Sequence, residues 1–149
     1  MLSYANSYGL WSTNPMTPLK VDHIAVVVED LEAALGFWQG ALGLPLGGRE
    51  HNEHEAVEIA FLPVGEARVE LLQPITTDSG IAKYLAKKGA GLHHVCLAVK
   101  DIEGAMSQLH EKGIELINET PRTREDGTRY AFVHPKSTGG VLVELYEVT

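Results

Sequence analysis

The sequence predicts an α+β fold made of two βαβββ modules that together form a concave metal-binding cleft. The main observation is an internal repeat, in which "VDHIAVVVEDLEAA" at 21–34 returns as "LHHVCLAVKDIEGA" at 92–105. The tripeptide "VEL" also occurs twice, at 69–71 and at 143–145. A repeat of this length in a short chain indicates one fold unit used twice.

The first copy reads as βαβββ followed by a connecting helix. Residues 22–28 alternate around β-branched side chains and predict a strand, after which Asp30 is a suitable N-cap for a helix that ends near Gly43. Further apolar-alternating segments predict strands at 45–50, 56–63 and 67–73, with a hairpin turn at 64–67. A helix is expected from Ser79 to Lys88, closed by Gly89.

The second copy repeats this order. It predicts a strand at 92–99, a helix from Asp101 to Gly113, and strands near 115–119, 129–134 and 141–147. The segments 121–127 and 134–140 are rich in turn residues and are expected to be loops. We therefore divide the chain into a flexible extension at 1–16, a first module with its connecting helix at 17–90 and a second module at 91–149.

Composition narrows the class of protein. A hydrophobic fraction of 44% with 21% charged residues is typical of a soluble globular protein. The formal charge of −8 argues against nonspecific binding to nucleic acid or to anionic membranes. Cys96 is the only cysteine, which excludes an intramolecular disulfide and favours a cytoplasmic location.

Strand alternation places a small set of polar residues on one face of each module. His23 shares a face with Ala25, and His94 with Cys96, while the bulky neighbours point the other way. The same reasoning assigns Glu58, Glu70 and Glu144 to the polar face. His93 should then point to the opposite face, with a packing or hydrogen-bonding role. Each copy thus supplies one histidine and one "VEL" glutamate.

Two imidazoles and two carboxylates form a suitable ligand set for a divalent metal that keeps open positions for substrate. A single histidine or glutamate on a strand is more often structural or solvated. The recurrence of both residue types across the repeat favours the metal site, since solvation does not require matching positions.

The chain from about Leu19 to Val148 resembles the vicinal oxygen chelate (glyoxalase/bleomycin resistance/dioxygenase) superfamily and, within it, the methylmalonyl-CoA epimerases. The resemblance is carried by "DHIAVVVEDLEAALGFW", "VELLQPITTDSGIAKYLAKKGAGLHHVCLAV" and "HPKSTGGVLVELYE". It implies a homodimer and one divalent ion, Co²⁺, Zn²⁺, Mn²⁺ or Ni²⁺. The implied metal ligands are His23, Glu70, His94 and Glu144.

The resemblance also implies the reaction. An epimerase interconverts (2R)- and (2S)-methylmalonyl-CoA by removing a proton from one face of C2 and returning it to the other, through an enolate that the metal stabilises. Two proton carriers are required. The resemblance assigns these roles to Glu58 and to metal-bound Glu144.

Several polar residues near these positions have two interpretations. Arg129 is the repeat equivalent of Glu58 and either positions the anionic substrate or forms a plain ion pair. Lys136, Ser137 and Thr138 either contact an anionic group of the substrate or belong to an ordinary polar loop. His54 and Glu55 depart from the pattern of related sequences, and the cluster around them is expected to be solvated or to bind an adventitious metal.

Two other functions stay open. A glyoxalase I-type lactoylglutathione lyase uses a similar metal quartet to isomerise a glutathione hemithioacetal. A non-catalytic drug-binding module shares the fold but has no use for a complete set of metal ligands. Metal analysis separates this module from both enzymes.

Overall fold

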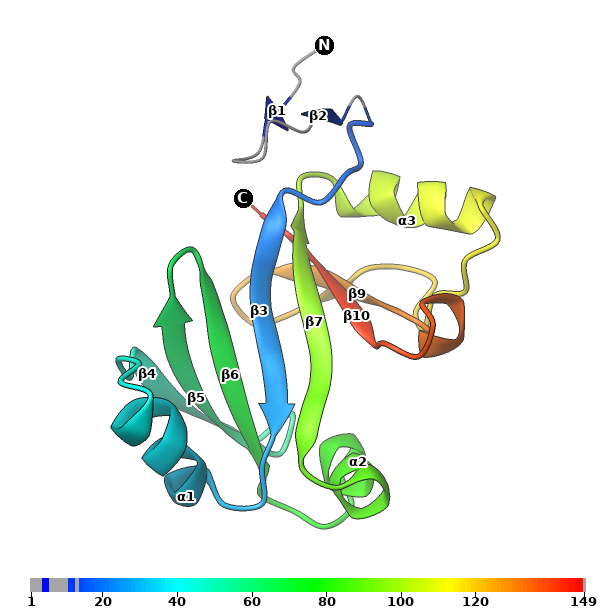
Figure 1. Cartoon of the computed structure of the whole chain (residues 1–149). Coiled ribbons are helices and arrows are strands. Elements are labelled where there is room, and N and C mark those ends of the chain that lie inside the picture. Colours follow the sequence, from blue (N-terminus) through cyan, green and yellow to red (C-terminus); the bar gives the residue numbers. More distant parts are fainter. Residues whose placement is uncertain (1–3, 6–10, 13, 149) are drawn as a thin grey trace. The chain divides into compact units, whose positions relative to one another are not determined.

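The computed structural model describes residues 4–5, 11–12 and 14–148. They form two compact units, of which unit 2 comprises residues 21–96 and unit 1 comprises residues 1–20 and 97–149. Figure 1 shows β7 (Gly91–Val99) as one continuous strand. The boundary between the two units falls within this strand, after Cys96. No described helix combines the length and apolar composition needed to span a membrane.

Unit 2 has the order βαβββ predicted for the first copy, followed by a helix and β7. Its strands lie in the order β4-β5-β6-β3-β7, with β3 parallel to β6 and β5 antiparallel to both β4 and β6. The elements are β3 (Lys20–Val27), α1 (Leu31–Leu35), β4 (Gly48–Asn52), β5 (Val57–Val64), β6 (Ala67–Pro74) and α2 (Gly80–Lys88).

The helices of unit 2 begin where the sequence predicts. The Asp30 carboxylate accepts a hydrogen bond from Ala33 N at 3.2 Å, and the Ser79 hydroxyl accepts one from Ala82 N at 3.1 Å. The first helix is α-helical only to Leu35 and continues as a π-helix over Gly36–Ala41. Gly43 follows with φ 84°, a conformation that favours glycine, so the helical segment ends near the predicted residue.

Unit 2 is apolar on both faces of its sheet. One face packs against α1 through a core that contains Ala60, Leu62 and Leu71. The other face packs against side chains of α2 through a core that contains Ala25, Val27, Val57, Ile59 and Leu72. Because both faces are covered, β5 presents buried residues at consecutive positions rather than a simple in–out alternation.

Unit 1 contains the second set of elements, and its strand order is β7-β10-β9-β8. Its core lies under α3 and includes Val99, Ile102, Ala131, Val133 and Leu145. The elements are α3 (Ile102–Glu111), β8 (Arg122–Thr123), β9 (Arg129–Val133), a 3₁₀ turn (Pro135–Ser137) and β10 (Val143–Glu147).

Two predictions for the second copy are wrong. The strand expected near 115–119 is reduced to a single bridge between Leu116 and Val133. Its ladder stops because the Asn118 side chain, and not the backbone, accepts the hydrogen bond of Phe132 N at 2.9 Å. The loop expected at 121–127 contains the short strand β8, which pairs with β9.

Part of the N-terminal segment is also described. Tyr4–Ala5 and Trp11–Ser12 pair as short antiparallel strands, β1 and β2. The rest of the predicted flexible extension up to residue 13 lies outside the described residues. Leu19 N donates to Ala98 O at 2.8 Å, and Met16 Sδ lies 2.6 Å from the position that a Cβ would take at Gly104 of α3. Residues 16–19 therefore pack within unit 1.

Candidate metal and catalytic site

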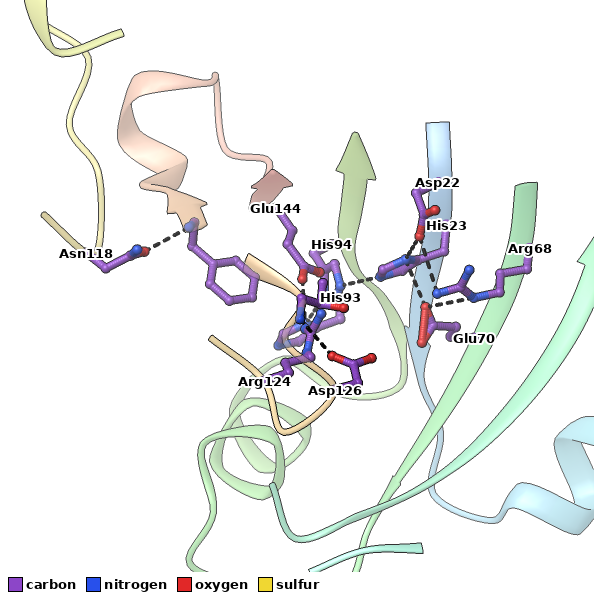
Figure 2. A network of polar contacts seen from close by, with 12 residues as sticks. Asp22, His23, Arg68, Glu70, His93, His94, Asn118, Arg124, Asp126 and Glu144 are labelled. Carbon is purple, nitrogen blue, oxygen red and sulfur yellow. Dashed lines mark hydrogen bonds and ion pairs between the residues drawn. The ribbon is translucent and has the colours of Figure 1, made fainter. Parts of the chain in front are cut away.

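The candidate site in unit 2 centres on two buried histidines from neighbouring strands. His23 on β3 is 5% exposed and His94 on β7 is 8% exposed. Their Nε2 atoms lie 3.2 Å apart, and their rings meet edge to face with centroids 5.3 Å apart (Figure 2). The prediction that these repeat equivalents converge is confirmed within this unit.

The other ring nitrogen of His23 contacts carboxylates. Its Nδ1 lies 2.8 Å from Asp22 Oδ2 and 2.9 Å from Glu70 Oε2. The positive charge of Arg68 offsets the negative charge of these two carboxylates. Its Nη2 lies 3.3 Å from Asp22 and its Nε lies 3.5 Å from Glu70. All four side chains lie in unit 2, and Figure 2 shows Arg68 and Glu70 beside His23. Both carboxylates thus contact the Nδ1 side of the His23 ring, and the Nε2 side is left to face His94.

His94 is held in a similar way by its own neighbour. His93 Nδ1 lies 2.8 Å from His94 Nδ1, so the two adjacent rings share one hydrogen bond. Tyr84 of α2 packs edge to face on His93, with ring centroids 4.7 Å apart. The predicted packing and hydrogen-bonding role of His93 is confirmed.

This arrangement fits a divalent metal. Histidine ligands bind Zn²⁺ at about 2.0–2.1 Å, so two of them on one ion bring their nitrogens to roughly 3 Å of each other. The observed 3.2 Å between the Nε2 atoms matches that spacing. A ligating histidine usually donates its other N–H to a carboxylate, as His23 is placed to do with Asp22. Glu70 contacts the Nδ1 side, so it must leave this contact to join the two Nε2 atoms.

Glu144 occupies the matching "VEL" position of unit 1. It lies on β10, is fully buried, and faces away from the α3 core because it alternates with Leu145. Its Oε1 accepts a hydrogen bond from Arg124 Nη2 at 2.8 Å, and the Arg124 guanidinium stacks over Tyr130 at 4.1 Å from the ring centroid. The polar-face prediction for Glu144 is confirmed within unit 1.

The face predicted for Glu58 is wrong. Glu58 pairs across the sheet with Gln73, and Ile59 pairs with Leu72. Directly paired residues share a face, so Ile59 lies on the same face as Glu70 while Glu58 lies on the α1 face. Gln73 confirms this side, because its Oε1 accepts a hydrogen bond from Leu31 N at the start of α1. Glu58 instead contacts His51 of β4.

Arg129 also lies on the helix-covered face of its unit. It shares a face with Ala131 and Val133 of the α3 core, and its guanidinium binds two carboxylates. Its Nη2 lies 3.0 Å from Glu147 Oε2, and its Nη1 lies 3.1 Å from Glu103 Oε1. These hydrogen bonds raise the pKa of Arg129. Of the two interpretations, the ion pair fits the structure.

Lys136 and Ser137 bind Glu115, in the segment after α3, and Thr138 bonds within its own loop. Lys136 Nζ lies 2.8 Å from Glu115 Oε2, and this contact lowers the pKa of Glu115. Ser137 Oγ accepts from Glu115 N at 3.0 Å, and Thr138 Oγ1 donates to Pro135 O at 3.1 Å. The interpretation as a polar structural loop accounts for all three side chains.

Sequence reasoning missed several residues of the network. The repeat contains a signal for Asp22, because Asp22 precedes His23 as His93 precedes His94. Strand alternation also predicts the place of Arg68, because it lies two positions before Glu70 in the predicted strand and so shares its face. Arg124 lies in a segment that the sequence predicts only as loop, and no pattern points to its contact with Glu144. The Cys96 sulfur lies within 4.8 Å of a carboxylate oxygen of Asp22 and of a ring nitrogen of His23.

Comparison with known proteins identifies the family. Residues 22–132 match the profile of the glyoxalase/bleomycin resistance protein/dioxygenase superfamily. The chain belongs to this superfamily. The resemblance and the α+β fold predicted from the sequence are thereby confirmed.

Relatives within the superfamily are more specific. The mitochondrial methylmalonyl-CoA epimerase of Bos taurus is 39% identical over 127 residues, covering 85% of this chain and 73% of the relative. The ethylmalonyl-CoA/methylmalonyl-CoA epimerase of Cereibacter sphaeroides is 35% identical over 131 residues, covering 87% and 98%. A variant of the Streptomyces coelicolor methylmalonyl-CoA epimerase, solved in complex with 2-nitronate-propionyl-CoA, is 32% identical, with a TM-score of 0.80 and coverage of 89% and 96%.

Proposed function

We propose that this protein is a methylmalonyl-CoA epimerase that uses a divalent metal held by His23, Glu70, His94 and Glu144. The observation that carries the proposal is the pair of Nε2 atoms 3.2 Å apart, with Asp22 on the far nitrogen of His23. The epimerases among its relatives support the reaction. The ligand set of imidazoles and carboxylates suits Co²⁺, Zn²⁺, Mn²⁺ or Ni²⁺.

The substrate carbon lies between a carboxylate and a thioester, so its proton is removable if the developing negative charge is stabilised. When bound, the metal supplies Lewis-acid stabilisation of that charge. Burial of His23, His94 and Glu144 withdraws these groups from water, which strengthens their electrostatic interactions. The buried Asp22 contact fixes the orientation of the His23 ring.

We propose Glu144 as one of the two proton carriers that inversion at C2 requires. Its burial next to Arg124 gives it a defined orientation on the face of β10 that points away from α3. Glu58 is not retained as the second proton carrier, because its side chain lies on the α1 face and Ile59 occupies the Glu70 face.

We also propose that the protein is a cytoplasmic homodimer. Cys96 is buried and the sequence offers it no cysteine partner, which is compatible with a reducing compartment. Light scattering during size-exclusion chromatography tests the dimer, for which a mass of twice 16.2 kDa is expected. A mass of a single chain at micromolar concentration would contradict it.

Uptake of solvent deuterium at C2 of methylmalonyl-CoA tests the function. The purified protein should catalyse exchange, chelator treatment should abolish it, and added Co²⁺ or Zn²⁺ should restore it. Glu144→Gln should lower the rate by at least about 10²-fold, the usual contribution of a positioned acid–base group. Glu58→Gln is the matched control and should keep the wild-type rate.

Two outcomes would overturn the proposal. Exchange that survives exhaustive metal removal would refute the metal dependence. Turnover of a glutathione hemithioacetal without exchange of methylmalonyl-CoA would instead assign the glyoxalase I-type activity.

A further inference from the structure

The two buried histidines have matching partners at the preceding position. Asp22 precedes His23 and His93 precedes His94, and the second pair lies 71 positions after the first. In both pairs the preceding side chain contacts Nδ1 of the histidine, at 2.8 Å in each case. The repeat has thus preserved a contact while changing the residue that makes it.

The chemistry of imidazole gives this contact a function. A neutral imidazole has one N–H and one lone pair, so a partner that accepts the Nδ1 hydrogen leaves the lone pair on Nε2. The Nε2 atoms are the ones that face each other at 3.2 Å. A partner on Nδ1 therefore prepares each ring to offer Nε2 as a ligand.

His93 is suited to this task only as an acceptor. Its Nδ1 must carry the lone pair and His94 Nδ1 must carry the hydrogen, which places the hydrogen of His93 on its own Nε2. Tyr84 restricts the His93 ring through its edge-to-face contact, and the Tyr84 hydroxyl is itself anchored by donating to Leu92 O at 2.9 Å. Helix α2 thus helps to orient the acceptor.

We infer that His93 is the positioning residue of His94, in the role that Asp22 has for His23. The inference rests on the proposed metal site. The two partners differ in chemistry, since Asp22 offers a carboxylate oxygen to Nδ1 of its histidine and His93 offers a ring nitrogen.

Metal affinity of the apo protein tests the inference without any assay of turnover. Zn²⁺ is titrated into wild-type protein, His93→Leu, His93→Asp and the control His110→Asn, an exposed histidine in the last turn of α3. His93→Leu should weaken Zn²⁺ binding by about 10–100-fold, the usual effect of losing such a partner. His93→Asp recreates the Asp22 contact and should bind at least as tightly as wild type, while His110→Asn should be unchanged.

A second readout separates positioning from general loss of structure. In Co²⁺-loaded protein the visible absorption bands report the ligand field, and they should change in His93→Leu and return in His93→Asp, while far-UV circular dichroism stays constant. Unchanged affinity and spectra in His93→Leu would overturn the inference, as would failure of His93→Asp to restore them. His23→Ala and His94→Ala test the proposed site itself, because normal Zn²⁺ binding in both would refute the function and not only the role of His93.

Discussion

Replacing Arg124 by methionine should destabilise the metal-free protein and tighten its binding of metal. Methionine keeps much of the apolar stem but removes the charge that faces the fully buried Glu144. Breaking a fully buried ion pair costs about 3–5 kcal/mol. The Arg124 side chain is 33% exposed, so solvent screens part of the interaction and the expected loss is about 1–3 kcal/mol.

Bound metal should offset part or all of this loss of stability, because the variant is expected to bind the ion more tightly than wild type does. A divalent ion on Glu144 supplies the positive charge that Arg124 provides in the metal-free protein. In wild type the ion also meets the repulsion of Arg124 or displaces its charge-assisted hydrogen bond, which is worth about 1.5–3 kcal/mol. Arg124→Met should therefore bind Zn²⁺ about tenfold more tightly, near the lower end of that range.

Urea unfolding with and without saturating Zn²⁺ measures both effects. Arg122→Met is the matched control, since Arg122 is exposed on the neighbouring strand β8 and its loss removes the same charge. The control should match wild type within about 0.5 kcal/mol. A loss of stability in Arg124→Met that Zn²⁺ does not offset, together with unchanged Zn²⁺ affinity, would refute the assignment of Glu144 as a ligand.

Two further predictions concern individual contacts. The hydrogen bond that Glu58 accepts from His51 raises the pKa of His51, so this pair adds stability below the ordinary histidine pKa of about 6.5 and loses it as pH rises through the raised value. Glu58→Gln should return the His51 pKa toward its ordinary value in an NMR titration, and an unchanged pKa would mean that the pair does not exist in solution. Gly104→Ala should cost about 1–3 kcal/mol in thermal or urea unfolding, because the new Cβ would lie 2.5 Å from the Asp101 carboxylate and 2.6 Å from Met16 Sδ. Trimming Met16 to alanine in the same chain should recover part of that loss, and no recovery would argue against packing of Met16 on α3.

The internal repeat accounts for most of what the sequence predicted correctly. It located both histidines, both "VEL" glutamates and the N-cap aspartates, of which Asp101 accepts from Gly104 N at 3.0 Å just as Asp30 caps α1. Local signals of this kind do not depend on tertiary packing. The π-helical continuation of α1 left no recognisable signal, because its residues also suit an α-helix.

The misplacement of Glu58 has a specific cause. The prediction assumed that every ionisable strand residue faces the site and every bulky residue faces a helix. In unit 2 both faces are covered, by α1 and by α2, so Ile59 and Ala60 are both buried and the pattern of β5 does not distinguish them. Only the pairing of Glu58 with Gln73 resolves the face.

Arg129 was misplaced by the same assumption. The repeat correctly made it the equivalent of Glu58, and both residues lie on the helix-covered face of their own unit. The equivalence therefore held while the face assigned to the pair was wrong. The carboxylates that bind Arg129 come from α3 and from the end of β10, which are far from it in sequence. No local sequence pattern predicts these contacts.

X-ray absorption spectroscopy of the Co²⁺- or Zn²⁺-loaded protein tests whether His23 and His94 hold one metal ion together. We expect one tightly bound ion per chain, with outer-shell scattering from two imidazoles whose nitrogens lie at about 2.0–2.1 Å and which bind through Nε2. His94→Ala should remove one of these imidazoles. A loaded protein whose spectrum contains no imidazole scattering would show that the two histidines are not metal ligands.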